Sequence, residues 1–155
     1  MRRYIFYMLT VCALIAGLSS CDESLVYSNY KHTPLVGWDK EDTLTFCIPP
    51  IKENGVYRLE LGLRTTIDYP FTSLNVNVEQ CILPHHKTQD YKVKCTVMEK
   101  NGALKGQGVS FYQYTYPLND IHLQHGDSVV FRIHHDMKRE TLPGIADIGI
   151  SLIRK

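Results

Sequence analysis

From residue 43 onward, apolar and polar residues alternate along the chain with a period of two. The clearest case is VYRLELGLRT at 56–65, where Tyr57, Leu59, Leu61 and Leu63 share one face and charged residues or glycine share the other. Similar alternation recurs at 44–48, 74–82, 91–97, 129–135 and 146–152. This period is typical of half-buried β-strands, and no stretch of comparable length has the three-and-four spacing of an amphipathic helix. The pattern therefore predicts many strands and little helix.

Turn-forming pairs separate the predicted strands. Asn54-Gly55 and Asn101-Gly102 suit tight hairpins because Asn-Gly readily supplies positive φ angles, and Gly126-Asp127 and Pro143-Gly144 mark two more turns. Short strands with one polar face each imply two antiparallel sheets packed face to face. We therefore predict an all-β fold over residues 41–155, a single-domain β-sandwich of two antiparallel sheets with jelly-roll-like topology. An immunoglobulin-type strand order is the alternative, because periodicity does not separate the two.

The N-terminal 21 residues have the layout of a bacterial lipoprotein signal. Two arginines precede an apolar run at 4–18, and small residues lead into Cys21. The run is shorter than the ~20 residues that a membrane-spanning helix needs. We therefore predict a signal peptide at 1–20 and a diacylglyceryl group on the thiol of Cys21; the alternative is an incidental cysteine in an ordinary signal. Residues 21–40, polar and irregular apart from Trp38, are predicted to form a lipidated tether that is able to dock.

Charge and length limit the class of protein. Without the signal, 15 basic and 16 acidic residues remain, so the net charge is −1 and there is no basic surface for nucleic acid. The remaining 135 residues suffice for one domain with its own core. Three cysteines also remain, and free thiols are favoured for all of them. Cys95 is predicted to point into the core, whereas Cys47 and Cys81 point outward and would form a disulfide only if their strands adjoin.

The segment FRIHHDMKRE at 131–140 carries the most reactive-looking side chains. On a strand, His134 and Asp136 share the outer face with Arg132, and His135 points the other way. His134 and Asp136 could contribute to a metal site, but zinc needs three or more protein ligands, and no recognised spacing supplies them. We favour a strand end at which Asp136 pairs with one of the bases of this segment, Arg132, Lys138 or Arg139. No nucleophile or phosphate-loop motif occurs, so we expect neither a cofactor nor enzymatic activity.

Two groups of aromatic residues suit binding. FYQYTYP at 111–117 places Tyr112, Tyr114 and Tyr116 on one face, which could form a platform for sugar rings or a partner surface. The opposite face of this strand is mostly polar, so the three tyrosines are expected to face the core. Tyr69 and Phe71 lie at the apex of the predicted loop at 64–75, where a sandwich often carries recognition, or they close one end of the core.

Several blocks of the chain resemble one known family. Cys21, the segment VYSNYKHTPLVGWDKEDTLTF, and the blocks LRTT-x-x-YPF-x-x-L and HDM-x-x-x-x-LPGI-x-x-IG are similar to the gliding motility-associated lipoprotein GldH family. The likeness covers nearly the whole chain after the signal. It brings no catalytic or metal-binding role to His134, His135 or Asp136.

The resemblance implies a lipoprotein that is anchored in the outer membrane through Cys21. It further implies a non-enzymatic assembly or accessory component of a gliding motility or secretion-type envelope apparatus, with other envelope proteins as partners. The alternative function is a cell-envelope glycan-binding β-sandwich that uses the tyrosine face. Candidate partner or glycan contacts are Tyr69, Phe71, Tyr112, Tyr114, Tyr116, His134 and Asp136.

Overall fold

The computed structural model describes residues 24–34 and 36–155, so the predicted signal and Cys21 lie outside the described residues. The described part contains ten β-strands and no helix, hence no helix long and apolar enough to cross a membrane. In chain order the strands are β1 (Leu25–His32), β2 (Trp38–Asp39), β3 (Leu44–Ile48), β4 (Gly55–Thr66), β5 (Ser73–Leu83), β6 (Lys87–Thr96), β7 (Phe111–Leu123), β8 (Ser128–His135), β9 (Thr141–Leu142) and β10 (Ile145–Arg154).

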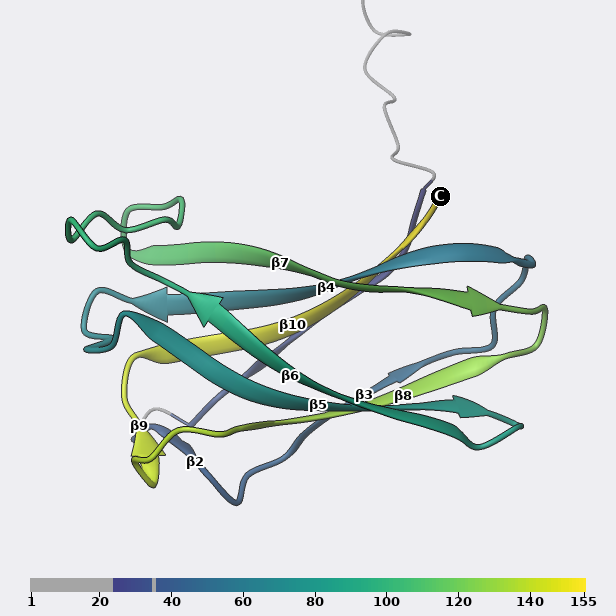
Figure 1. The fold of residues 1–155 in the computed structure, drawn as a ribbon, viewed down its shortest axis with the longest axis horizontal. Helices are drawn as coiled ribbons and strands as arrows, with labels where there is room; N and C mark the ends of the chain where they lie inside the picture. Colours follow the sequence, from purple (N-terminus) through teal and green to yellow (C-terminus); the bar gives the residue numbers. More distant parts are fainter. Residues whose placement is uncertain (1–23, 35) are drawn as a thin grey trace, which may run out of the picture.

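Eight of these strands form two antiparallel sheets that pack face to face (Figure 1). Sheet I has the order β1-β10-β4-β7, sheet II has the order β3-β8-β5-β6, and the short strands β2 and β9 pair with each other. Numbered along the chain without the two short strands, the orders are 1-8-3-6 and 2-7-4-5, which is a jelly roll. The predicted β-sandwich and its jelly-roll-like topology are therefore confirmed, and the immunoglobulin-type order is excluded.

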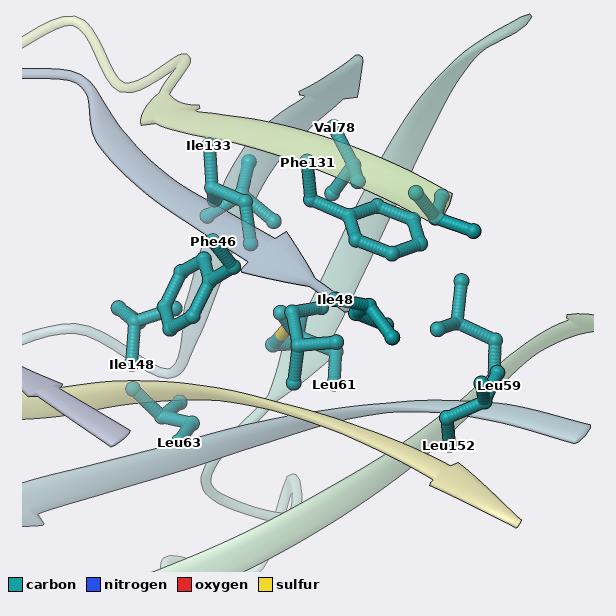
Figure 2. Packing of buried hydrophobic residues seen from close by; sticks show 14 of the residues in the cluster. Phe46, Ile48, Leu59, Leu61, Leu63, Val78, Phe131, Ile133, Ile148 and Leu152 are labelled. Carbon is teal, nitrogen blue, oxygen red and sulfur yellow. The ribbon is translucent and has the colours of Figure 1, made fainter. Parts of the chain in front are cut away.

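Apolar side chains from alternate positions of both sheets fill the space between them (Figure 2). The predicted inward residues Tyr57, Leu59, Leu61 and Leu63 of β4 are all buried. Facing residues from sheet II include Phe46, Val78, Phe131 and Ile133. Each such side chain stabilises the fold by about 1.5–3 kcal/mol on burial, so the alternation that predicts the strands also supplies the core.

One face assignment in β10 is wrong by a single residue. The pattern placed Ala146 in the core with Ile148, Ile150 and Leu152, but Ile145 is the more deeply buried residue. A register shift against β4 between Ile145 and Asp147 causes this difference. The extra residue in such a bulge interrupts the alternation that the prediction assumed.

The prediction of an irregular tether over 21–40 is wrong for residues 25–32, which form β1 along the edge of sheet I. β1 pairs with β10 from Leu25 opposite Ile153 to His32 opposite Asp147. Its sequence does not alternate because β1 is an edge strand, mostly exposed on both faces, with a register shift after Leu25. Trp38 is fully buried in β2 and so belongs to the core, whereas Val36 is 88% exposed.

The three described cysteines are free. Cys95 is buried and Cys47 is exposed, as the face assignment predicted. Cys47 and Cys81 are both paired with Val130, because β8 lies between β3 and β5. Two strand spacings amount to about 10 Å, beyond the reach of a disulfide. The strands of Cys47 and Cys81 therefore do not adjoin, which was the condition for a disulfide between them.

Candidate functional site

His135 is a buried structural residue at the end of β8. Its Nε2 atom lies 3.2 Å from the carbonyl oxygen of Trp38, and its Nδ1 atom lies 3.4 Å from the amide nitrogen of Met137. A carbonyl only accepts, so Nε2 carries the proton and Nδ1 accepts from the amide. The ring also meets the Trp38 ring edge to face at 5.2 Å. Burial lowers the pKa of His135, so a neutral imidazole fits this position.

His134 and Asp136 point outward, as predicted, but they bind different neighbours. His134 Nε2 lies 3.1 Å from Nδ2 of Asn77, and Asp136 Oδ2 lies 3.3 Å from Nζ of Lys92. Asp136 is therefore paired, but the expected partner within its own segment is wrong, because Lys92 comes from β6. Arg132 is bound to Glu79 at 2.8 Å. Over residues 24–34 and 36–155, no group of three or more His, Cys, Asp or Glu residues could hold a metal ion.

The tyrosines of β7 face the core, which is the interpretation that the sequence favoured. Tyr114 is 5% exposed, and its ring stacks on that of Tyr116 with centroids 6.3 Å apart. Tyr116 Oη donates to the carbonyl of Thr96 at 2.9 Å and so ties β7 to β6. A Cβ added to Gly106 would lie 2.5 Å from Cζ of Tyr114, so the connection between β6 and β7 covers that ring. Burial raises the pKa of both phenols.

A hollow of about 660 Å³ opens beside these rings and is lined partly by Lys105, Gln107 and Gln113. Tyr114 itself does not offer an exposed ring face to it. A glycan platform needs exposed, coplanar rings, so this arrangement argues against the platform that the sequence allowed.

Tyr69 and Phe71 meet edge to face, with ring centroids 5.6 Å apart. Tyr69 is buried, and its Oη atom donates to the carbonyl of Ser73 at 3.0 Å. Phe71 is partly buried against the core. The two rings close one end of the core, which was the structural alternative to a recognition loop.

A hollow that the sequence did not predict lies at the end of sheet I where β1 ends and β7 and β10 begin. It has a volume of about 910 Å³, and we call it the distal hollow. The strand register brings one residue from each strand into line there, namely His32, Asp147, Arg64 and Gln113. Asp147 is buried, with an ion pair to Nδ1 of His32 and an Arg64 nitrogen 3.8 Å away. Arg64 Nε donates to Gln113 Oε1 at 3.2 Å.

The rest of the lining of the distal hollow is largely apolar. Pro34, Phe111, Pro143, Ile145 and Ala146 contribute to the lining. The exposed side chains of Val36, Ile67, Val109 and Phe111 are each within two residues of a lining position. Sequence reasoning missed this site because its parts are distant in the chain. The sequence did hold one indication of the site: the blocks LRTT and LPGI, which carry the family resemblance, both contribute residues to its lining.

Comparisons with known proteins point to one family. A family model described as GldH lipoprotein matches residues 25–152. The gliding motility lipoprotein GldH of Flavobacterium johnsoniae is 26% identical over 145 residues, covering 89% of this chain and 90% of that protein.

Two solved structures are similar in outline. A family 35 carbohydrate-binding module from Clostridium thermocellum aligns with a TM-score of 0.40 and 13% identity, over 80% of this chain and 87% of that one. A protein from Sulfurospirillum deleyianum aligns with a TM-score of 0.42 and 12% identity, over 83% of this chain and 98% of that one. At these scores neither likeness supports an inference about function.

Proposed function

Because this chain belongs to the GldH lipoprotein family, we propose that it is a membrane-anchored, non-enzymatic component that assists assembly of a gliding motility or secretion-type envelope apparatus. The match of the family model to residues 25–152 carries this proposal. The family is one of lipoproteins associated with gliding motility, as the sequence resemblance implied. In this proposal the lipid holds the sandwich at the membrane and raises its effective concentration for partner subunits.

The short spacing between Cys21 and β1 supports a role at the membrane surface. Cys21 precedes Leu25 by four residues, which span at most about 14 Å even when fully extended. A lipid on Cys21 would therefore keep the start of β1 close to the bilayer. Leu25 and Val26 are exposed at this end of sheet I, where a membrane would cover them. The amide of Arg154 donates to the carbonyl of Ser24, so the end of β10 shares this location.

The outer membrane is the location that we propose for the anchor. Two acyl chains suffice for stable attachment, at about 0.8 kcal/mol for each buried methylene. Changing Cys21 to Ala should release the protein from the membrane fraction while leaving its fold intact, since Cys21 lies before the first strand. Continued retention of this variant in outer-membrane vesicles would contradict the anchor.

In-cell cross-linking of the lipidated protein, followed by mass spectrometry, tests the assembly role. Motility or secretion subunits among the captured proteins would support it. Capture of polysaccharide alone would favour the glycan-binding alternative instead. The Cys21→Ala variant serves as a matched control, because its unchanged fold should capture the same partners less efficiently once it leaves the membrane.

A further inference from the structure

We infer that the outer face of sheet II binds a neutral sugar unit in a hollow of about 430 Å³ where β5, β6 and β8 meet. We call it the sheet II hollow. This inference goes beyond the proposed function and does not depend on it. It rests on three features, which are a continuous polar surface set by the strand register, a buried amide atom of Asn77 without a partner, and the unpaired carboxylate of Asp90.

The strand register places the polar side chains of the sheet II hollow side by side. Asn77 on β5 lies opposite Lys92 on β6 and His134 on β8, and Glu79, two residues further along β5, lies opposite Asp90. Along β5 these two positions alternate with buried ones, so their side chains point away from the core. Opposed residues on neighbouring strands are about 4.5–5.5 Å apart. The five side chains therefore form one continuous surface.

Asn77 has a buried polar atom without a hydrogen-bond partner. Its Nδ2 atom lies 3.1 Å from Nε2 of His134, whereas its Oδ1 atom is buried and unpaired among the described residues. Turning the amide over would pair Oδ1 with the imidazole and leave Nδ2 unpaired, so one of the two atoms lacks a partner in either orientation. A buried polar group without a partner is unfavourable, which suits a position that a ligand completes.

One carboxylate at the sheet II hollow is also unpaired. Arg132 pairs with Glu79 at 2.8 Å, and Lys92 pairs with Asp136 at 3.3 Å. The exposed side chain of Asp90 has no ion pair or hydrogen bond within the described part of the chain, and it lies directly opposite Glu79. Like charges opposite each other on neighbouring strands are destabilising. Such a departure from a stable arrangement is expected where the side chains serve binding.

A sugar hydroxyl fits the chemistry of the sheet II hollow better than a charged group does. The hollow offers acceptors on Asp90 and a donor on Lys92, whose ammonium keeps N–H groups to spare after its bond to Asp136. A basic side chain only donates and a phosphate dianion only accepts, whereas a hydroxyl does both. A hydroxyl therefore also completes the Asn77 amide in either orientation, and neighbouring hydroxyls of one sugar ring can both donate to the Asp90 carboxylate.

Ring stacking contributes little at this site. Tyr91 also lines the sheet II hollow, but its hydroxyl donates to Gln80 at 2.7 Å and its ring packs against the core. Recognition would therefore rely on hydrogen bonds, unlike the tyrosine platform that the sequence allowed. Because such bonds replace bonds to water, each adds little net affinity, and we expect a dissociation constant of about 1 mM.

Saturation-transfer NMR tests the site on the lipidated chain in phospholipid nanodiscs. The probes are the neutral disaccharides cellobiose, maltose and N,N′-diacetylchitobiose, each at about 10 mM, above the expected dissociation constant. Empty nanodiscs provide the blank, and a trilysine peptide tests for a basic ligand. We expect at least one of the three sugars to receive saturation from the protein and the peptide to receive none.

Variants then assign the binding to the sheet II hollow. Asp90→Ala removes an exposed carboxylate and should weaken binding of that sugar about tenfold, the change expected when a hydrogen bond to a charged group is lost. Asn77→Ala should weaken it as well. Glu41→Ala, which removes an exposed carboxylate outside the hollow, should leave binding unchanged. Asp90→Ala should not lower the urea midpoint, since it removes the repulsion from Glu79, so its weaker binding would not reflect unfolding.

Other outcomes overturn the inference. Saturation of none of the three sugars, equal binding by Asp90→Ala and the parent chain, or an equal loss of binding in Glu41→Ala would each refute the sheet II hollow as a sugar site. Saturation of trilysine without any sugar would assign the hollow to a basic chain instead. Because the assay contains no other envelope protein, its failure leaves the assembly role standing, and failure of the assembly role leaves sugar binding standing.

Discussion

The phenol ring of Tyr30 lies against the backbone of Gly62, in the space that a side chain at position 62 would occupy. The same ring covers Gly149, where an added Cβ would come within 2.7 Å of it. Tyr30 on β1 thus crosses the outer face of both β10 and β4, and the Arg64 guanidinium lies 4.3 Å from the centre of its ring. These contacts attach the edge strand that follows the proposed anchor to the centre of sheet I.

Changing Gly62 to Val should displace Tyr30 and destabilise the domain by about 1–3 kcal/mol, the usual cost of overpacking. Urea denaturation of the purified soluble domain measures this change. Gly55→Ala is the matched control, because its added Cβ would meet its nearest neighbour at an ordinary 3.6 Å and should alter stability little. Equal stability of Gly62→Val and the parent chain would show that β1 is not held in this way.

Most of the fold could be predicted from the sequence because one face of most strands is buried. Tyr57 to Leu63 alternate in β4 since one side meets the core and the other meets water. β1 was missed for the opposite reason: it lies at an edge, and Tyr30 packs on glycines, not against the core. The bulge before Asp147 likewise broke the alternation on which the β10 prediction depended.

The candidate sites were harder to predict because they depend on which strands become neighbours. The sequence placed Asp136 near Lys138 and Arg139, whereas pairing of β5 with β6 and β8 brings Lys92 to it. The distal hollow needs His32, Arg64 and Asp147 side by side, and only the order of sheet I puts them there. Strand order is set by long-range packing, which periodicity does not encode.

Burial of His135 predicts a stability that falls in mild acid. Because its pKa is lowered from the ordinary 6.5, the unfolded chain binds a proton more readily than the folded chain. The stabilising effect of the neutral ring is complete above pH 6.5 and is lost as the pH falls through the folded pKa. Nearby Lys40 also disfavours the cation, and Asp39 opposes this effect.

Urea denaturation between pH 7.5 and 5 measures this dependence. His135→Gln should lower stability by about 1–3 kcal/mol at pH 7.5, because buried hydrogen bonds are lost, and should flatten the pH dependence. His134→Gln, a change at the outward-facing neighbour, should leave the slope of the unfolding free energy against pH as it is in the parent protein. A slope that is identical in all three proteins would refute the assignment to His135.

The thiols should differ sharply in reactivity. Burial raises the pKa of Cys95 to about 12, so almost no thiolate forms at neutral pH, whereas Cys47 is exposed. A maleimide should label Cys47 within minutes and Cys95 only after unfolding, as mass spectrometry of the peptides would reveal. Cys47→Ser should abolish the fast reaction without changing the urea midpoint. Fast labelling of Cys95 in the folded protein would show that the core opens there.

Removal of metal should not affect the folded domain. His134 and His135 point to opposite faces, His135 is engaged by Trp38 and Met137, and Asp136 is paired with Lys92. EDTA should therefore leave the melting temperature unchanged, and His134→Ala should change stability by less than about 1 kcal/mol because it alters one part-buried polar contact. Stoichiometric zinc in the purified protein that is lost in His134→Ala would instead place a metal on the outer face of β8.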